Sequence, residues 1–278
     1  MNNLKTVVLM AAISGLLIAV GGAIGGFGGA ITFAVIAGAM NFASYWFSAD
    51  IVLRTSGAKE IQREQDPQLF DMIADVARRA EMPMPRVYIM DSPQPNAFAT
   101  GRSPKHAAVA VTTGIRQLLT DRELFGVLGH EISHVKNRDI LTSSIVATIA
   151  SAISMISWMA MWFGGRDNRN PWAGLVVMLV APIAATLIQL GISRTREYQA
   201  DRDGARTVGD PEALASALAK LQLGAQRVPM DVPASTAHLF IVNPLRGGGV
   251  AGLFSTHPPL EKRIERLRSM SVSARSAD

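Results

Sequence analysis

Residues 120–139 read TDRELFGVLGHEISHVKNRD and contain two histidines, His130 and His134, that stand four positions apart. On an α-helix this spacing places both imidazoles on one face, one turn apart, where they can bind a single metal ion. Glu131 follows the first histidine, and its carboxylate can reach a water on that metal and take its proton. The alternative is a pair of unrelated histidines on the surface of a helix.

The flanking residues predict that this segment is helical. Thr120 and Glu123 have the spacing of a capping box, which satisfies backbone N–H groups at the start of a helix. Apolar residues then recur at helical spacing, namely Leu124, Val127, Leu128, Ile132 and Val135. Neither Gly nor Pro occurs between Glu131 and Phe163, so we expect the helix to continue into the apolar run that follows it.

The composition indicates a membrane protein without thiol ligands. Of the 278 residues, 49% are apolar and only 18% are charged, which is unusual for a soluble protein. The chain has no cysteine, so any metal must be held by His, Asp or Glu. Its net charge is +5, but the basic residues are scattered beside apolar segments without interleaved aromatic residues. This pattern fits membrane topology and argues against nucleic-acid binding.

Four uncharged runs each approach the ~20 residues that a bilayer-spanning helix requires. They are residues 6–22, 31–48, 140–163 and 172–192. A glycine cluster separates the first two and a short polar loop separates the last two, so we predict two transmembrane hairpins. A cleaved signal peptide is the alternative for the first run. A pair of buried core helices is the alternative for the last two runs, because the third contains many serines. A further alternative is that these two runs lie only partly in the bilayer.

The remaining segments predict an α+β catalytic domain. Asp66 and Pro67 start an amphipathic helix, and residues 86–90 and 107–112 read as strands. The expected fold is therefore an α-helical membrane protein with four transmembrane helices and an α+β catalytic domain. We divide the chain into a hairpin at 1–49, a first catalytic part at 50–139, a second hairpin at 140–193 and a second catalytic part at 194–278.

A catalytic zinc site with two histidines needs a third protein ligand, and the segment SRTREYQAD at residues 193–201 offers one. Glu197 is the best-placed carboxylate by context. Asp201 lies one turn further along the same helical face, where it can accept the free N–H of a liganding histidine. The alternative is that the segment is only a solvated helix beside the membrane.

The motifs in their order resemble a known family. Besides the two hairpins they are PNAFATG at residues 95–101, HEISH and NRD at 130–139, SRTREYQAD at 193–201 and STHPPLEKRI at 255–264. In this order the chain resembles the HtpX family of membrane zinc endopeptidases, relatives of the CAAX prenyl proteases. The resemblance covers nearly the whole sequence.

The resemblance implies a zincin-like site of the gluzincin type, with one Zn²⁺ per subunit held by His130, His134 and Glu197 and with Glu131 as the catalytic base. It also implies a hydrolase of membrane-protein quality control and the stress response, whose substrates are damaged or misfolded membrane proteins and unfolded polypeptides. Asn96 and His257 match positions that approach the metal, where they would stabilise the oxyanion. The alternatives are that Asn96 serves a Pro-rich turn and that His257 shapes a helix cap.

The charges predict the orientation in the bilayer. If all four runs span, residues 50–139 and the part after Ser193 lie on one side, which brings the HEISH helix and Glu197 together. The basic residues near the membrane on that side are Lys5, Arg54, Lys59, Lys136, Arg138, Arg194 and Arg196, against Arg166 and Arg169 on the other. The positive-inside rule then predicts that the active site faces the cytoplasm. The resemblance implies that the chain is a multi-pass protein of the bacterial inner membrane.

The strand at residues 107–112 is a candidate for substrate binding. A peptide that pairs with a free sheet edge is held by backbone hydrogen bonds, with little demand on its sequence. We therefore expect Ala107, Val109 and Val111 to lie along the docked substrate. The alternative is that this strand is interior.

Two classes of function agree with these patterns. One is a membrane endopeptidase that uses metal-activated water. The other is a non-catalytic membrane protein with a structural zinc, or a binding module that retains the ligands. Glu131 favours the enzyme, because a structural site needs no base and normally has a fourth protein ligand.

Overall fold

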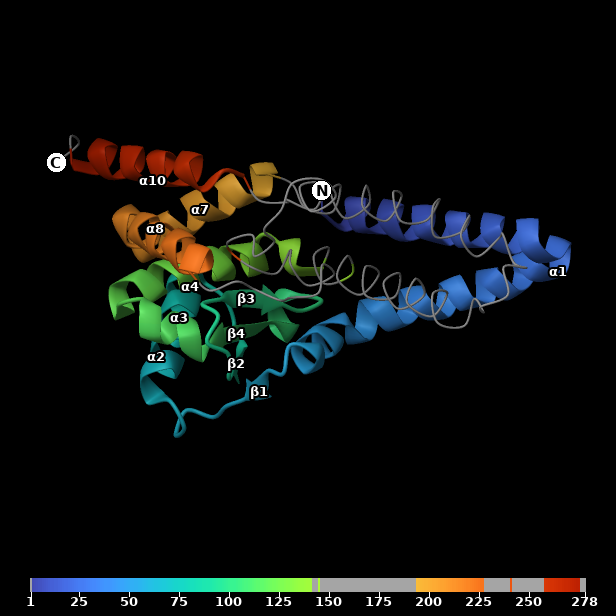
Figure 1. The fold of residues 1–278 in the computed structure, drawn as a ribbon, viewed down its shortest axis with the longest axis horizontal. Coiled ribbons are helices and arrows are strands. Elements are labelled where there is room, and N and C mark those ends of the chain that lie inside the picture. The colour runs from blue at the N-terminus through green and yellow to red at the C-terminus, as the bar shows by residue number, and fades with distance from the viewer. Residues whose placement is uncertain (1, 142–144, 146–193, 228–240, 242–257, 276–278) are drawn as a thin grey trace.

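The computed structural model describes residues 2–141, 145, 194–227, 241 and 258–275. In this part of the chain a long helical hairpin projects from a domain that combines a small sheet with several helices (Figure 1). The expected spans at 140–163 and 172–192 lie almost entirely outside the described residues. Among the described residues, one helix, Gly25–Thr55, is long and apolar enough to cross a membrane, and Met10–Ala19 is a shorter apolar stretch.

The hairpin is α1, Asn2–Thr55, which the glycine cluster divides into two arms. Gly25 and Gly26 leave helical geometry, and Gly26 has φ +58°, a conformation that favours glycine. The arms lie antiparallel (Figure 1), and the Asn41 side chain donates a hydrogen bond of 2.7 Å to Ser14 Oγ between them. The predicted helical hairpin with a glycine turn is thus confirmed as a fold.

The sheet has four strands in the order β1-β2-β4-β3. They are β1 (Lys59–Glu60), β2 (Arg86–Met90), β3 (Ala97–Thr100) and β4 (Ala108–Thr112). β2 and β4 are parallel, whereas β1 pairs with β2 and β3 pairs with β4 in antiparallel fashion. The two predicted strands are confirmed, and two short strands are added to them.

The prediction that strand 107–112 is a free edge is wrong. β4 is interior, with Val109 opposite Val87 on one side and Ala99 on the other, and Val111 opposite Ile89 and Ala97. The Ala107 carbonyl already accepts a hydrogen bond from the Arg86 N–H. Because β3 occupies the edge that was expected to be open, the backbone groups of Ala107, Val109 and Val111 are not available to a substrate.

β4 is also covered on both faces. Val109 and Val111 belong to the main hydrophobic core, whereas Ala108 and Ala110 belong to a smaller cluster that includes Val52 and Leu53 at the end of α1. The smaller cluster therefore attaches the hairpin to the sheet. The sequence of a strand buried on both faces is a continuous apolar run. This explains why apolar and polar residues hardly alternate along β4.

The other elements are helices that pack on the sheet or on one another. They are α2 (Pro67–Arg79), the 3₁₀ turn η1 (Pro104–His106), α3 (Thr113–Leu118), α4 (Asp121–Lys136), α7 (Arg194–Val208), α8 (Pro211–Arg227) and α10 (Leu260–Arg275). α2 begins as predicted, with the Asp66 carboxylate accepting from the Leu69 N–H at 3.0 Å. α4 packs against β3, α2, α7 and α8, so the helix with the two histidines lies at the centre of the domain.

The expectation that α4 continues unbroken into the next apolar run is wrong. The helix ends at Lys136, Asn137 forms its C-cap, and Arg138 adopts φ +59°. Helices commonly end at a residue in the left-handed conformation, and here Arg138 adopts it in place of the usual glycine, so the break occurs without Gly or Pro. The turn directs Asp139 back toward α4, where its carboxylate meets His134.

The predicted capping box at the start of α4 is confirmed, and its Glu123 forms hydrogen bonds beyond those of the motif. Glu123 accepts from the Thr120 N–H at 2.9 Å, and also from Ser216 Oγ at 2.6 Å and Lys220 Nζ at 2.7 Å on α8. Burial alone would raise the pKa of Glu123, but the hydrogen bonds from Lys220, Ser216 and Thr120 outweigh it and lower the pKa from 4.5 to about 2. The ionised carboxylate therefore links α8 to the start of α4.

This cluster predicts an acid-sensitive contribution to stability. Because the folded-state pKa of Glu123 lies below 4.5, its contribution is complete above pH 4.5 and is lost as the pH falls toward 2. The shift sets an upper limit of about 3 kcal/mol on the contribution to the unfolding free energy, and solvent screening at the partly exposed Lys220 lowers it. In Glu123→Gln we expect a lower melting temperature at pH 7 and a flatter profile of melting temperature between pH 5 and 3. Glu265→Gln, an exposed change on α10, should keep the wild-type profile, and an equally steep profile in both variants contradicts the prediction.

Candidate metal centre

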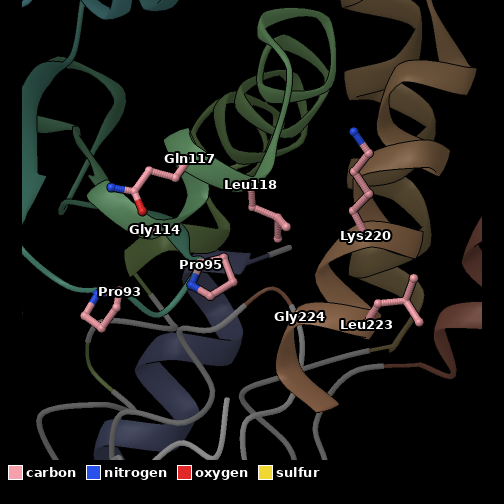
Figure 2. Close-up of a pocket in the computed structure, with 8 residues that line it drawn as sticks. All are labelled: Pro93, Pro95, Gly114, Gln117, Leu118, Lys220, Leu223 and Gly224. Carbon is pink, nitrogen blue, oxygen red and sulfur yellow. The ribbon is translucent and has the colours of Figure 1, made fainter. Parts of the chain in front are cut away.

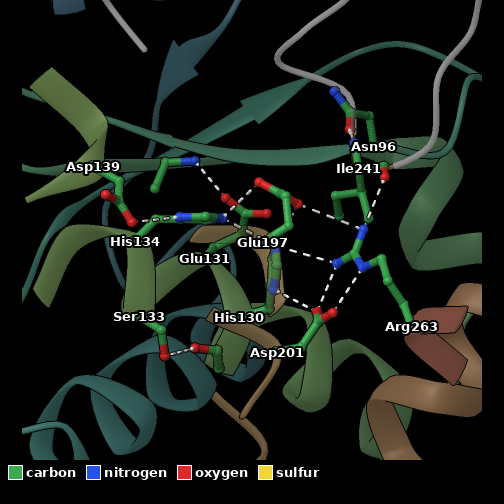
Figure 3. A network of polar contacts seen from close by, with 12 residues as sticks. Asn96, His130, Glu131, Ser133, His134, Asp139, Glu197, Asp201, Ile241 and Arg263 are labelled. Atoms are coloured by element: carbon green, nitrogen blue, oxygen red, sulfur yellow. Dashed lines mark hydrogen bonds and ion pairs between the residues drawn. The ribbon is translucent and has the colours of Figure 1, made fainter. Parts of the chain in front are cut away.

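Three side chains from two helices meet at one point. His130 and His134 leave the same face of α4, and Glu197 approaches from α7 (Figure 3). The two Nε2 atoms are 3.2 Å apart, His134 Nε2 lies 3.4 Å from Glu197 Oε1, and His130 Nε2 lies 3.8 Å from Glu197 Oε2. The histidines and the carboxylate that the sequence singled out are thus brought together, although 63 positions separate His134 from Glu197.

The spacing of these atoms fits a tetrahedral zinc ion. Zinc binds nitrogen and oxygen at about 2.0–2.1 Å, so two ligands of a tetrahedral site are about 3.3 Å apart. The three pairs of atoms, at 3.2, 3.4 and 3.8 Å, bracket that value. The donor set of two imidazoles and one carboxylate is also one of the sets that catalytic zinc uses, and it leaves a fourth position for water.

Each histidine has a carboxylate behind it. Asp201 Oδ1 lies 3.0 Å from His130 Nδ1, in the place that the sequence predicted, and Asp139 Oδ2 lies 3.1 Å from His134 Nδ1. A carboxylate at Nδ1 favours the tautomer with a proton on that nitrogen, which leaves the Nε2 lone pair free for a metal. Both rings are therefore oriented to bind through Nε2.

The environment of the site favours a positive charge. Burial opposes protonation of His134, but hydrogen bonds with Asp139 and Glu197 and the charges of Glu197 and Glu131 outweigh it and raise the pKa of His134 to about 10. A divalent cation supplies the same positive charge without protonating the ring. The carboxylates around the two histidines thus favour a cation at this point.

Glu131 lies beside the histidines and contacts the sheet. Its Oε2 accepts a hydrogen bond of 2.9 Å from the Ala99 N–H of β3, and only 6% of the residue is exposed. Burial raises the pKa of Glu131 despite the opposing effect of the two histidines. A raised pKa suits a carboxylate that must take a proton and release it again near neutral pH.

Sequence reasoning missed Arg263, which is fully buried on α10. Its guanidinium donates to both oxygens of Asp201, at 2.8 and 2.7 Å, and its Nη1 lies 3.6 Å from Glu197 Oε2 (Figure 3). It therefore holds in place the carboxylate behind His130 and approaches the third candidate ligand. Its only signal in the sequence is a position within STHPPLEKRI, since α10 reaches the site through tertiary packing.

Asp139 was also missed, although it belongs to the NRD motif. Only the helix break at Arg138 brings its carboxylate to His134, and its Oδ1 also lies 3.5 Å from Arg196 on α7. The expectation of a continuous helix hid this contact, because an unbroken α4 would carry the residue away from His134.

Of the two candidate oxyanion donors, the structure describes Asn96 and does not describe His257. Asn96 is buried, and its Oδ1 accepts a hydrogen bond of 3.3 Å from the Ile241 N–H. The Ile241 carbonyl in turn lies 3.5 Å from Arg263 Nη1, so Asn96 joins the network around the site at its margin (Figure 3). His257 lies outside the described residues.

Helices α4 and α7 approach closely where Gly129 meets Gly204. A Cβ at Gly204 would lie 2.7 Å from the Gly129 carbonyl carbon and 2.7 Å from the His130 nitrogen. Backbone atoms cannot move aside as a flexible side chain does, so a methyl group here must separate the helices. The spacing between His130 and Glu197 therefore depends on this glycine.

We expect Gly204→Ala to destabilise the fold by about 1–3 kcal/mol, the usual cost of overpacking, and to weaken metal binding. The melting temperature and the zinc content after dialysis against a weak chelator measure the two effects. Gly38→Ala is the matched control, because its Cβ meets nothing within 4 Å. Wild-type zinc retention in Gly204→Ala would show that the helix spacing does not set the site.

A separate cavity of about 470 Å³ lies between α3 and α8 (Figure 2). Its lining residues are Pro93, Pro95, Gly114, Gln117, Leu118, Lys220, Leu223 and Gly224. None of them is a candidate metal ligand or base. The cavity is therefore not part of the metal centre.

The sequence matches a peptidase family over most of its length. Residues 63–271 match the model described as peptidase family M48. A protease HtpX homologue of Methylibium petroleiphilum is 53% identical over 276 residues, which cover 97% of this chain and 98% of that relative. Another, of Burkholderia thailandensis, is 53% identical over 281 residues that cover 99% of each chain.

A solved structure shares the fold. The crystal structure of Ste24p from S. mikatae aligns with a TM-score of 0.51 at 20% sequence identity. The alignment covers 95% of this chain and 64% of that protein. This chain therefore matches slightly less than two thirds of the length of Ste24p. The similarity concerns the arrangement of the elements.

Proposed function

This chain belongs to peptidase family M48 and is a metalloprotease, and we propose that it is a zinc endopeptidase with His130, His134 and Glu197 as metal ligands. The observation that carries the proposal is the convergence of the three side chains, whose ligand atoms all lie within 4.8 Å of one another. The Nδ1 contacts with Asp201 and Asp139 support it, because they leave both Nε2 atoms available.

The residues around the site supply the rest of the chemistry. Zinc, when bound, polarises the scissile carbonyl and lowers the pKa of the attacking water. Glu131 takes the proton of that water and passes it to the leaving amine. The Ala99 N–H fixes one oxygen of Glu131, so the carboxylate is held in place before substrate arrives. Arg263 holds Asp201 and, through it, the ring of His130.

We propose further that the enzyme acts at the bacterial inner membrane, with its catalytic domain in the cytoplasm, on damaged or misfolded membrane proteins. The apolar helix Gly25–Thr55 supports the membrane location, since Phe27, Ile31 and Val35 on it are 82%, 51% and 69% exposed. Side chains of this kind are covered by lipid when such a helix spans a bilayer. The four spans, their orientation and the role in stress-related quality control rest on the sequence patterns and the resemblance.

The test is proteolysis of an unfolded membrane protein by the purified chain in detergent or nanodiscs. Cleavage should stop in the presence of a zinc chelator and return when stoichiometric Zn²⁺ is added after the chelator is removed. A folded, stable membrane protein serves as the control substrate. Cleavage that persists without metal contradicts the zinc assignment, and equal cleavage of folded and unfolded substrates contradicts the quality-control role.

We also propose that Asn96 and His257 stabilise the oxyanion. A hydrogen-bond donor aimed at that oxygen contributes about 2.7–4 kcal/mol to the transition state. For Asn96→Ala and His257→Ala we therefore expect kcat to fall about 10²- to 10³-fold with KM nearly unchanged. A residue that only supports the fold lowers the melting temperature and leaves kcat of the surviving enzyme intact, and that result contradicts the role.

A further inference from the structure

The turn between β3 and β4 carries basic but no acidic residues and contacts α1. It contains Arg102, Lys105 and His106, and no Asp or Glu occurs between Asp91 and Asp121. The Arg102 guanidinium lies over the Trp46 ring, 4.4 Å from its centroid. In Figure 1 this end of the β3–β4 pair extends toward the second arm of α1.

Trp46 lies at the depth of a membrane surface if α1 spans the bilayer. A helix rises about 1.5 Å per residue, so the stretch from Gly26 to Trp46 is about 30 Å long, the thickness of the hydrocarbon core. Tyr45, Trp46 and Phe47 are 39%, 44% and 51% exposed, and the first charged residue after them is Asp50. Aromatic residues gather at the level of lipid headgroups, and Arg102 is held at that same level.

Arg102 retains hydrogen-bonding capacity for an anion. One of its N–H groups lies 2.9 Å from His106 Nε2, and Ser103 Oγ lies 2.8 Å from His106 Nδ1, so these contacts fix the turn. Among the described residues no carboxylate forms an ion pair with Arg102 or Lys105. A guanidinium has five N–H donors in a planar fork that matches the oxygens of a phosphate.

We propose that Arg102, Lys105 and Trp46 form a site for the phosphate of an anionic lipid headgroup. The site rests on the proposed membrane location. The turn follows β3 directly, and the Ala99 N–H of β3 donates a hydrogen bond to Glu131. A headgroup bound at Arg102 would therefore hold β3, the strand that contacts the proposed catalytic base, at the membrane surface. Phosphatidylglycerol fits the chemistry, because its phosphate carries an uncompensated negative charge.

The experiment measures lipid binding by the full chain in nanodiscs of phosphatidylcholine. The protein is titrated with short-chain dihexanoyl phosphatidylglycerol, with dihexanoyl phosphatidylcholine or with inorganic phosphate, and binding is followed by microscale thermophoresis. Wild type should bind the glycerol lipid in preference to the other two. Removing both cations in Arg102→Gln/Lys105→Gln should weaken that binding about 10- to 30-fold, because each cation near a membrane surface contributes about 1 kcal/mol.

Two matched variants keep the test specific. Arg63→Gln/Lys262→Gln removes the same charge from exposed positions on other elements and should bind like wild type. Arg102→Lys/Lys105→Arg keeps the charge and should retain the preference for the glycerol lipid. Equal binding of the two lipids, or wild-type binding by Arg102→Gln/Lys105→Gln, overturns the proposal. Equally tight binding of inorganic phosphate overturns the lipid assignment.

The failure of this inference can be distinguished from the failure of the proposed function. Extraction of wild-type membranes with alkaline carbonate tests whether α1 is inserted, and zinc-dependent proteolysis is measured on the same preparation. Release of the protein overturns both the membrane location and the lipid site. Retention of an active protein that shows no lipid preference overturns the lipid site alone.

Discussion

Glu131→Gln should reduce turnover by about 10²- to 10⁴-fold, the range expected when a general base is lost. Glutamine keeps the size of the side chain and can still accept the hydrogen bond from the Ala99 N–H, but it cannot take a proton at neutral pH. The metal ligands are unchanged, so zinc content should remain near one per chain. Turnover of an unfolded membrane protein and metal analysis on the same purified sample measure the two quantities.

The two measurements separate a base from a ligand or a structural residue. If Glu131→Gln loses zinc, the residue helps to hold the metal. If it keeps near-normal turnover, the glutamate is only a buried helix residue and the catalytic role is refuted. A lower melting temperature without loss of kcat would indicate that the contact with β3 serves the fold.

Glu197→Ala should lose most of its zinc and with it the metal-dependent activity. Removal of one of three protein ligands leaves His130 and His134 alone, and metal catalysis supplies several kcal/mol of transition-state stabilisation. We therefore expect activity to fall by about 10³-fold or more. His134→Ala should behave in the same way, since its Nε2 lies 3.4 Å from Glu197 Oε1 in the same cluster.

Arg202→Ala is the matched control for Glu197→Ala. Arg202 lies on the same helix, and its side chain is exposed. This variant should keep both zinc and activity. Unchanged zinc stoichiometry in Glu197→Ala and His134→Ala would refute the assignment of the metal site.

Short sequence motifs at the ends of helices correctly predicted where those helices begin or turn. The capping box at Thr120, the Asp66-Pro67 helix start and the glycine turn of α1 all depend on contacts within a few residues, and each is present. The break at Arg138 was missed because only Gly and Pro were treated as breakers. β3 was missed because its four residues follow a Pro-rich stretch that resembles a turn.

The candidate metal centre was predictable to the extent that its residues share a helix or a motif. His130 and His134 are fixed relative to each other by helical spacing alone, whereas the position of Glu197 requires the packing of α7 on α4 through two glycines. Residue spacing could not predict the role of Arg263, because its contact with Asp201 joins α10 to α7 across 62 positions. The interior position of β4 depended on β3, so the error in one strand produced the error about the substrate edge.

Because the site is divided between α4 and α7, the order of synthesis determines when it can be completed. A ribosome makes the chain from its N-terminus, so the two histidines of α4 emerge well before Glu197 of α7, and Arg263 of α10 emerges later still. A nascent chain that ends anywhere before residue 197 lacks the third ligand of the proposed zinc site. On this assignment, the order of the residues means that the zinc site can be completed only after Glu197 has been synthesised.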